Sequence, residues 1–192
     1  MKNLLIMTFS IIFLTSCTPV ITTNSSLNDF VMMGTKTNSD VNVNYKFESK
    51  LTSEHTVTMG SFKPKSNVNA VFKSMLDEYM GSKFLNLNGN DLDVIVTLNS
   101  MEVVQNVSND FGNVMAQLSS YGGEASVISK IKLSVQVSGQ DIDETKIISA
   151  SAEKIYNTSV NEGQNMIYAE LMNKSYNKAI MQINAFLESV EL

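Results

Sequence analysis

Two hydrophobic periods run along this chain, and they predict its elements. A period of two, in which apolar and polar residues alternate, is typical of a strand with one buried face. Five segments have this period, and they are residues 41–47, 55–62, 92–104, 125–139 and 145–156. The last three are long and follow one another along the chain, so they predict an antiparallel meander.

Apolar residues three and four positions apart predict two helices. The first begins after Ser66, whose hydroxyl can cap a helix N-terminus, and stops near Gly81, because glycine tolerates the conformation common at helix C-termini. The second runs from about residue 166 to residue 190 and keeps helical spacing throughout. The stripe of the first helix consists of Val68, Val71, Phe72, Met75, Leu76 and Tyr79.

The order of these elements is strand, strand, helix, three strands, helix. Two helices with one apolar stripe each and a sheet with one apolar face can bury one another. The sequence therefore predicts an α+β fold. We expect a two-layer sandwich in which an antiparallel sheet of about five strands packs against two helices.

Residues 1–16 precede this pattern and have the features of a secretory signal peptide. Lys2 supplies a positive charge, and residues 4–14 form an apolar run that only Thr8 and Ser10 interrupt. A helix that spans a bilayer needs about 20 apolar residues, so this run is too short to remain as a transmembrane anchor.

The end of this run, Leu14-Thr15-Ser16-Cys17, resembles the lipobox of bacterial lipoproteins. The resemblance implies that a diacylglycerol is attached to the thiol of Cys17 and that cleavage leaves this residue at the mature N-terminus. Without lipidation, Cys17 would be the lone free thiol of a secreted protein, since the chain has no second cysteine. Two or more acyl chains, such as palmitate, give stable attachment to a membrane.

The residues after Cys17 indicate where the lipoprotein resides and how its domain is attached. In lipoproteins of this type an aspartate after the lipidated cysteine tends to retain the protein in the inner membrane. Thr18 occupies that position here, so the resemblance implies the outer membrane, with the domain facing the periplasm. Residues 17–40, which are rich in Thr, Asn and Ser, are predicted to form a flexible tether. Residues 41–192 then suffice for a single domain.

Composition narrows the possible partners. The hydrophobic content of 43% and the charged content of 17% are typical of a globular chain. The net charge of −5 argues against nucleic acid and against electrostatic adhesion to anionic lipid, which both need basic surfaces. All basic residues are lysine, so bidentate recognition of phosphate or carboxylate by arginine is not available.

The motifs that resemble catalytic or metal sites have simpler explanations. His55 is the only histidine, and no GxSxG elbow accompanies it. Ser151 and Lys154 match the SxxK motif, but a strand would place them on opposite faces. Residues 86–93 carry oxygen ligands at alternate positions without the order of an EF-hand loop, and zinc ligands are scarce. We therefore expect no enzymatic activity, no metal and no cofactor.

The segment of residues 106–124 separates two strands of the predicted meander and is too long for a tight hairpin. Phe111, Met115, Leu118 and Tyr121 recur in it at helical spacing. The segment is expected either to cap the open end of the core or to act as a flap that presents these apolar groups to a partner or an acyl chain. Loops of this length are often functional.

Two hypotheses of function remain. The first is a non-enzymatic accessory or scaffold lipoprotein of a cell-envelope complex with a protein partner. The alternative is a carrier that holds a lipid or small ligand between sheet and helices, as an auxiliary subunit of an envelope transport system. The element order over residues 41–190, behind a lipobox and a tether, is similar to that of YajG-type outer-membrane lipoproteins.

Overall fold

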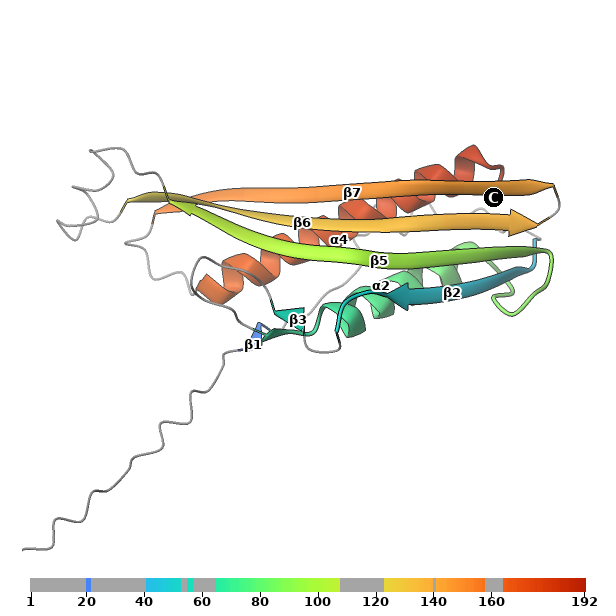
Figure 1. Ribbon diagram of the computed structural model, residues 1–192, viewed down its shortest axis with the longest axis horizontal. Helices are drawn as coiled ribbons and strands as arrows, with labels where there is room; N and C mark the ends of the chain where they lie inside the picture. The colour runs from blue at the N-terminus through green and yellow to red at the C-terminus, as the bar shows by residue number, and fades with distance from the viewer. Residues whose placement is uncertain are drawn as a thin grey trace, which may run out of the picture.

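The computed structural model describes residues 20–21, 41–52, 55–56, 65–107, 123–139, 141–157 and 164–192. The main body is a four-stranded sheet with two helices against one of its faces (Figure 1). The predicted α+β class with two helices is confirmed. The sheet contains β2 (Val43–Ser49), β5 (Leu92–Val107), β6 (Glu124–Gly139) and β7 (Ile142–Asn157), and the helices are α2 (Val68–Lys83) and α4 (Gln164–Ser189).

The sheet differs from the prediction in the number and direction of its strands. Its order is β2-β5-β6-β7; β2 pairs with β5 in parallel, and the other two pairs are antiparallel. The expectation of about five antiparallel strands is therefore wrong in both respects. Since α2 lies between β2 and β5 in the chain, the connection is a helical crossover, and such a crossover joins parallel strands.

The described part of the second predicted strand, residues 55–62, does not join the main sheet. This part is β3 (His55–Thr56), which belongs to a small separate sheet with the order β1-β4-β3. The other members are β1 (Val20–Ile21) and β4 (Lys65–Ser66). Residues 57–62 lie outside the described part of the chain.

Alternation along β5 and β6 places apolar pairs on the face of the sheet that the helices cover. Val94 lies opposite Val137, and Val96 lies opposite Val135, and all four side chains are buried. After Leu98 the register shifts by one residue, so that no residue of β6 lies directly opposite Asn99. This shift is a β-bulge, which bends a strand locally and increases its twist.

The two helices complete the core on that face. α4 lies against β6 and β7, and α2 contacts both β2 and α4 (Figure 1). The ring of Phe72 on α2 lies 6.2 Å from that of Phe47 on β2 and 5.6 Å from that of Tyr176 on α4, so three elements meet at one aromatic cluster. The predicted apolar stripes are confirmed as buried or partly buried.

The ends of α2 differ from the prediction. The residue before the helix is Asn67, which makes no side-chain cap hydrogen bond, and the expected cap Ser66 is a buried residue of β4. Gly81 lies inside the helix, which continues to Lys83 because the chain turns away only where Phe84 takes an extended conformation and becomes buried. In the described parts of the chain, no helix has the length and apolarity that crossing a bilayer requires.

Candidate functional site

The site residues that the sequence singles out lie outside the part of the chain that the structure describes. Cys17 lies before residues 20–21, the first residues that the structure describes. Phe111, Met115, Leu118 and Tyr121 fall within residues 108–122, which are not described either. Lipidation at Cys17 and the flap of residues 106–124 therefore stay predictions.

The side of the sheet that faces away from α2 and α4 is here called the open face. Figure 1 shows both helices on the opposite side. Alternate residues of β7 on the open face include Ile147 and Ile155, and each is 66% exposed. Large aliphatic side chains at such exposure lose the free energy that burial would supply. The open face therefore combines a broad surface with two apolar side chains that no described residue covers.

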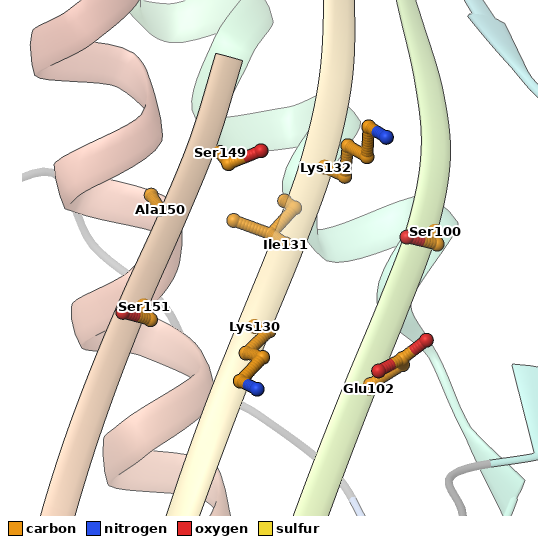
Figure 2. Close-up of a pocket in the computed structure, with 8 residues that line it drawn as sticks. All are labelled: Ser100, Glu102, Lys130, Ile131, Lys132, Ser149, Ala150 and Ser151. Carbon is orange, nitrogen blue, oxygen red and sulfur yellow. The ribbon is translucent and has the colours of Figure 1, made fainter.

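A hollow of about 290 Å³ lies on the open face beside the bulge at Asn99. Two cross-strand rows form it: one runs from Ser100 through Lys132 to Ser149, and the other runs from Glu102 through Lys130 to Ser151. Figure 2 shows these side chains together. The residues that line the hollow are Ser100, Glu102, Lys130, Ile131, Lys132, Ser149, Ala150 and Ser151.

Each row has a lysine of β6 in its middle, with residues of β5 and β7 on either side. The small serine side chains leave space above the strands and present hydroxyl groups that can donate or accept hydrogen bonds. Lys130 and Lys132 extend in different directions from β6 (Figure 2). The hollow therefore has a polar rim, and only Ile131 and Ala150 contribute apolar residues to it.

The charges of the hollow are not balanced by ion pairs within the described residues. Lys130 lies opposite Glu102 in the β5–β6 register, yet no ion pair or hydrogen bond of the described chain involves the ammonium group of Lys130 or Lys132. Other lysines do have acidic partners. These pairs are Lys46–Glu48 (2.5 Å), Lys73–Asp77 (2.5 Å), Lys154–Glu170 (3.2 Å) and Lys174–Glu170 (2.5 Å).

The structure confirms that Ser151 and Lys154 do not form an SxxK site. Ser151 lines the hollow on the open face. The ammonium group of Lys154 lies 3.2 Å from the Glu170 carboxylate of α4, on the other side of the sheet. Extended backbone sends residues three apart to opposite faces, so the lysine cannot activate the serine.

The oxygen-rich loop of residues 86–93 uses its side chains within the protein. The Asp91 carboxylate accepts hydrogen bonds from the backbone N–H of Asn42 (3.0 Å) and from its side-chain amide (2.8 Å), and these bonds hold the pKa of Asp91 below its ordinary value. The backbone N–H of Asn88 donates to Oδ1 of Asn86 (3.0 Å). Among the described residues, no group of His, Cys, Asp and Glu side chains is arranged to hold a metal ion.

The space between the sheet and the helices, where the carrier hypothesis places its ligand, is occupied by side chains of both layers. Leu98 and Leu133 of the sheet and Tyr176, Ala179 and Ile183 of α4 are fully buried there. Interiors of this kind are close-packed. Nothing in the described residues supports an apolar ligand between the layers.

The hollow is a feature that the sequence pattern does not identify. Lys130 and Lys132 occupy polar positions of a clear alternation, so the sequence indicates only that they lie on the exposed face. Their neighbours on β5 depend on the register after the bulge at Asn99, and a bulge has no reliable sequence signal here. Two lysines two residues apart on one strand are the only hint that the sequence contains.

The sequence matches no protein-family model and no curated protein. Solved structures do match the fold. A protein described as a neuraminyllactose-binding hemagglutinin homolog from Helicobacter pylori is 12% identical, with a TM-score of 0.50 over 78% of this chain and 84% of that chain.

Two further matches are bacterial lipoproteins. The rare lipoprotein B from Shewanella oneidensis is 7% identical, with a TM-score of 0.46 over 77% of this chain and 99% of that chain. The minor lipoprotein from Acinetobacter baumannii is 10% identical, with a TM-score of 0.42 over 79% of this chain and 96% of that chain. At such low identities these similarities concern the fold alone.

Proposed function

We propose that this protein is a lipid-anchored lipoprotein of the bacterial envelope that acts as a non-enzymatic accessory or scaffold subunit of an envelope complex. The open face of the sheet is the observation that supports the accessory role. It carries Ile147 and Ile155, each 66% exposed, and a partner that covered them would gain the free energy of burying both side chains. The partner is a protein that contacts this face.

The anchor of the proposed protein is the lipid on Cys17. The resemblance of residues 1–17 to a lipoprotein signal peptide supports this attachment, and Thr18 favours the outer membrane with the domain in the periplasm. Val20–Ile21 form β1 and pair with β4, so residues 18–19 are the part of the chain between Cys17 and the first strand. The flap of residues 106–124 is a second surface for the same partner.

Replacement of the lipidated residue tests the anchor. Cys17→Ser is expected to abolish metabolic labelling with palmitate and to release the protein from the membrane fraction or leave it unprocessed. Thr18→Ser, which keeps the cysteine and removes one methyl group, is the matched control and retains the label. Palmitate labelling that persists in Cys17→Ser would show that the anchor is elsewhere.

Crosslinking from the open face tests the accessory role. A photo-crosslinking amino acid at Ile147 or Ile155 is expected to trap one discrete envelope protein in living cells. The matched control is Leu85, which is 72% exposed but belongs to the loop after α2 and not to a strand of the sheet. Equal crosslinking from Leu85 and from both isoleucine positions would mean that the open face is no specific interface.

A further inference from the structure

Lys130 and Lys132 place two positive charges next to each other on an acidic protein. They lie two residues apart on the same face of β6, and their Cβ atoms are therefore about 7 Å apart. Lys46 and Glu48 on β2 have the same spacing, but there the two charges are opposite and form an ion pair of 2.5 Å. Like charges at this distance repel each other, and an anion bound between them offsets that repulsion.

The hydroxyl and ammonium groups that line the hollow can bind a polar ligand. Ser100, Ser149 and Ser151 surround the two lysines, and all three are small side chains with a hydroxyl group. An apolar ligand would separate these groups from water without offering hydrogen bonds in return, which is unfavourable. An oxyanion can accept hydrogen bonds from both the ammonium and the hydroxyl groups.

The size of the hollow and the position of Glu102 limit the ligand further. Its volume of about 290 Å³ is near the lower end of the range for small-molecule sites, so it exceeds the needs of a bare oxyanion. Glu102 occupies one end of the Lys130 row, where its carboxylate can accept hydrogen bonds from ligand hydroxyl groups and disfavours a second anionic group. The other row, Ser100–Lys132–Ser149, contains no acidic residue.

We propose that this hollow binds a small hydroxylated anion of about monosaccharide size, with its phosphate or carboxylate group on the Lys132 row and its hydroxyl groups toward Glu102. Charge complementarity and the hydroxyl groups of the lining carry the assignment. It depends neither on lipidation of Cys17 nor on a protein partner at the open face. A free solute and the head group of a lipid can both supply such an anion.

Titration of the purified full chain in a non-ionic detergent tests the proposal, with glucose 6-phosphate as the probe and glucose as the uncharged control. Calorimetry and amide chemical shifts are expected to show saturable binding of glucose 6-phosphate, with shifts at Lys130, Lys132 and Ser149. Glucose is expected to bind at least about tenfold more weakly, because it lacks the charge-assisted hydrogen bonds.

Three variants distinguish binding by the residues of the hollow from a nonspecific effect of the protein's net charge. Lys132→Gln is expected to weaken binding about tenfold, through loss of one charge-assisted hydrogen bond. Glu102→Gln is expected to strengthen binding severalfold, an effect that damage to the fold cannot mimic. Lys50→Gln removes the same charge from an exposed position after β2, outside the hollow, and should leave binding unchanged.

A second experiment distinguishes a free solute from a lipid head group as the source of the anion. The full chain is placed in nanodiscs of phosphatidylcholine with or without phosphatidylglycerol, whose head group is a hydroxylated phosphate. Shifts of the same amides in the phosphatidylglycerol discs would assign the anion to a lipid, and shifts with glucose 6-phosphate alone would assign it to a solute. If neither probe shifts these amides, or if Lys132→Gln binds as tightly as the wild type, the proposal is overturned.

Discussion

The hydroxyl oxygens of Ser129 on β6 and Ser175 on α4 lie 2.9 Å apart, and both side chains are fully buried. Ser175 also donates a hydrogen bond to the carbonyl oxygen of Met172 (2.8 Å). A serine hydroxyl has one proton, so Ser129 must be the donor in the bond between the two serines. This bond joins the sheet to the long helix inside an otherwise apolar layer.

Substitution of Ser175, the acceptor, is therefore expected to lower the free energy of unfolding more than substitution of Ser129, the donor. Ser175→Ala leaves the Ser129 hydroxyl proton buried without an acceptor and should lower the free energy of unfolding by about 2 kcal/mol. Ser129→Ala leaves Ser175 bonded to Met172 and should cost about 1 kcal/mol. The double variant should lose less free energy of unfolding than the sum of the two single losses. Chemical denaturation of the wild type, the two single variants and the double variant measures this. Additive losses would mean that the serines do not interact.

Gly89 allows two backbone segments to approach closely. Its N–H donates to the carbonyl oxygen of Val43 (3.1 Å), and a methyl group at Gly89 would lie 2.1 Å from Cβ of Asn42. Gly89→Ala is therefore expected to lower the free energy of unfolding by about 3 kcal/mol, measured by thermal and chemical denaturation.

Gly81 provides the matched control for that substitution. It lies inside α2, and a methyl group there would meet no atom within 4 Å. Gly81→Ala is expected to raise the free energy of unfolding by about 0.5–1 kcal/mol, because alanine loses less conformational entropy in a helix. Similar effects of both substitutions, in either direction, would contradict the packing described around Gly89.

Two side chains of α4 bind carbonyl groups at the free edge of β7. The ammonium group of Lys178 donates to the carbonyl oxygen of Ser151 (2.9 Å), and the side-chain amide of Gln182 donates to that of Ser149 (3.4 Å). Free edges can pair with strands of other chains, and lysine at an edge opposes such pairing. The double variant Lys178→Ala and Gln182→Ala is expected to increase self-association in analytical ultracentrifugation.

The control for edge pairing lies on the same helix. Lys174 bonds to Glu170 of α4 rather than to β7, so Lys174→Ala removes an equal charge without exposing the edge. It is expected to leave the association constant at the wild-type value. If the double variant associates no more than Lys174→Ala does, the two side chains do not protect the edge.

Lys83 is buried between α2 and α4, with only 1% of its surface exposed. Its ammonium group lies 3.5 Å from Oδ1 of Asn184, which also accepts a hydrogen bond from the Tyr79 hydroxyl (2.9 Å). Burial lowers the pKa of Lys83 below its ordinary value of 10.5, although the nearby charge of Glu188 opposes that shift. The charged form of Lys83 therefore destabilises the folded state.

Lys83→Met is expected to raise the free energy of unfolding by about 1 kcal/mol at pH 7, because methionine fills a similar volume without a charge. Between the lowered pKa in the folded state and the ordinary value, the unfolded chain holds more protons, so the wild type gains stability as the pH rises. The difference in the free energy of unfolding between Lys83→Met and the wild type should therefore decrease toward pH 10. Denaturation series of both proteins at several pH values check this.

The sequence predicted the elements whose pattern is local. Alternation along β6 and β7 and the helical stripe from Tyr168 to Leu187 depend on which face of each element is buried, and this information lies in neighbouring residues. The structure confirms these elements with differences of a few residues at their ends. The helix signals at Ser66 and Gly81 were misleading, because packing of Phe84 and pairing of β4 outweigh weak local preferences.

What the sequence by itself determined is the α+β class, the buried face of each long element, and the features of residues 1–17 on which the proposed anchor rests. Only the tertiary structure decided that β2 runs parallel to β5, and that the bulge at Asn99 brings Ser100 beside Lys132. Strand partners and register join residues far apart in the chain, and no local pattern encodes them. The open face and its hollow arise from that pairing, and so only the folded chain reveals them.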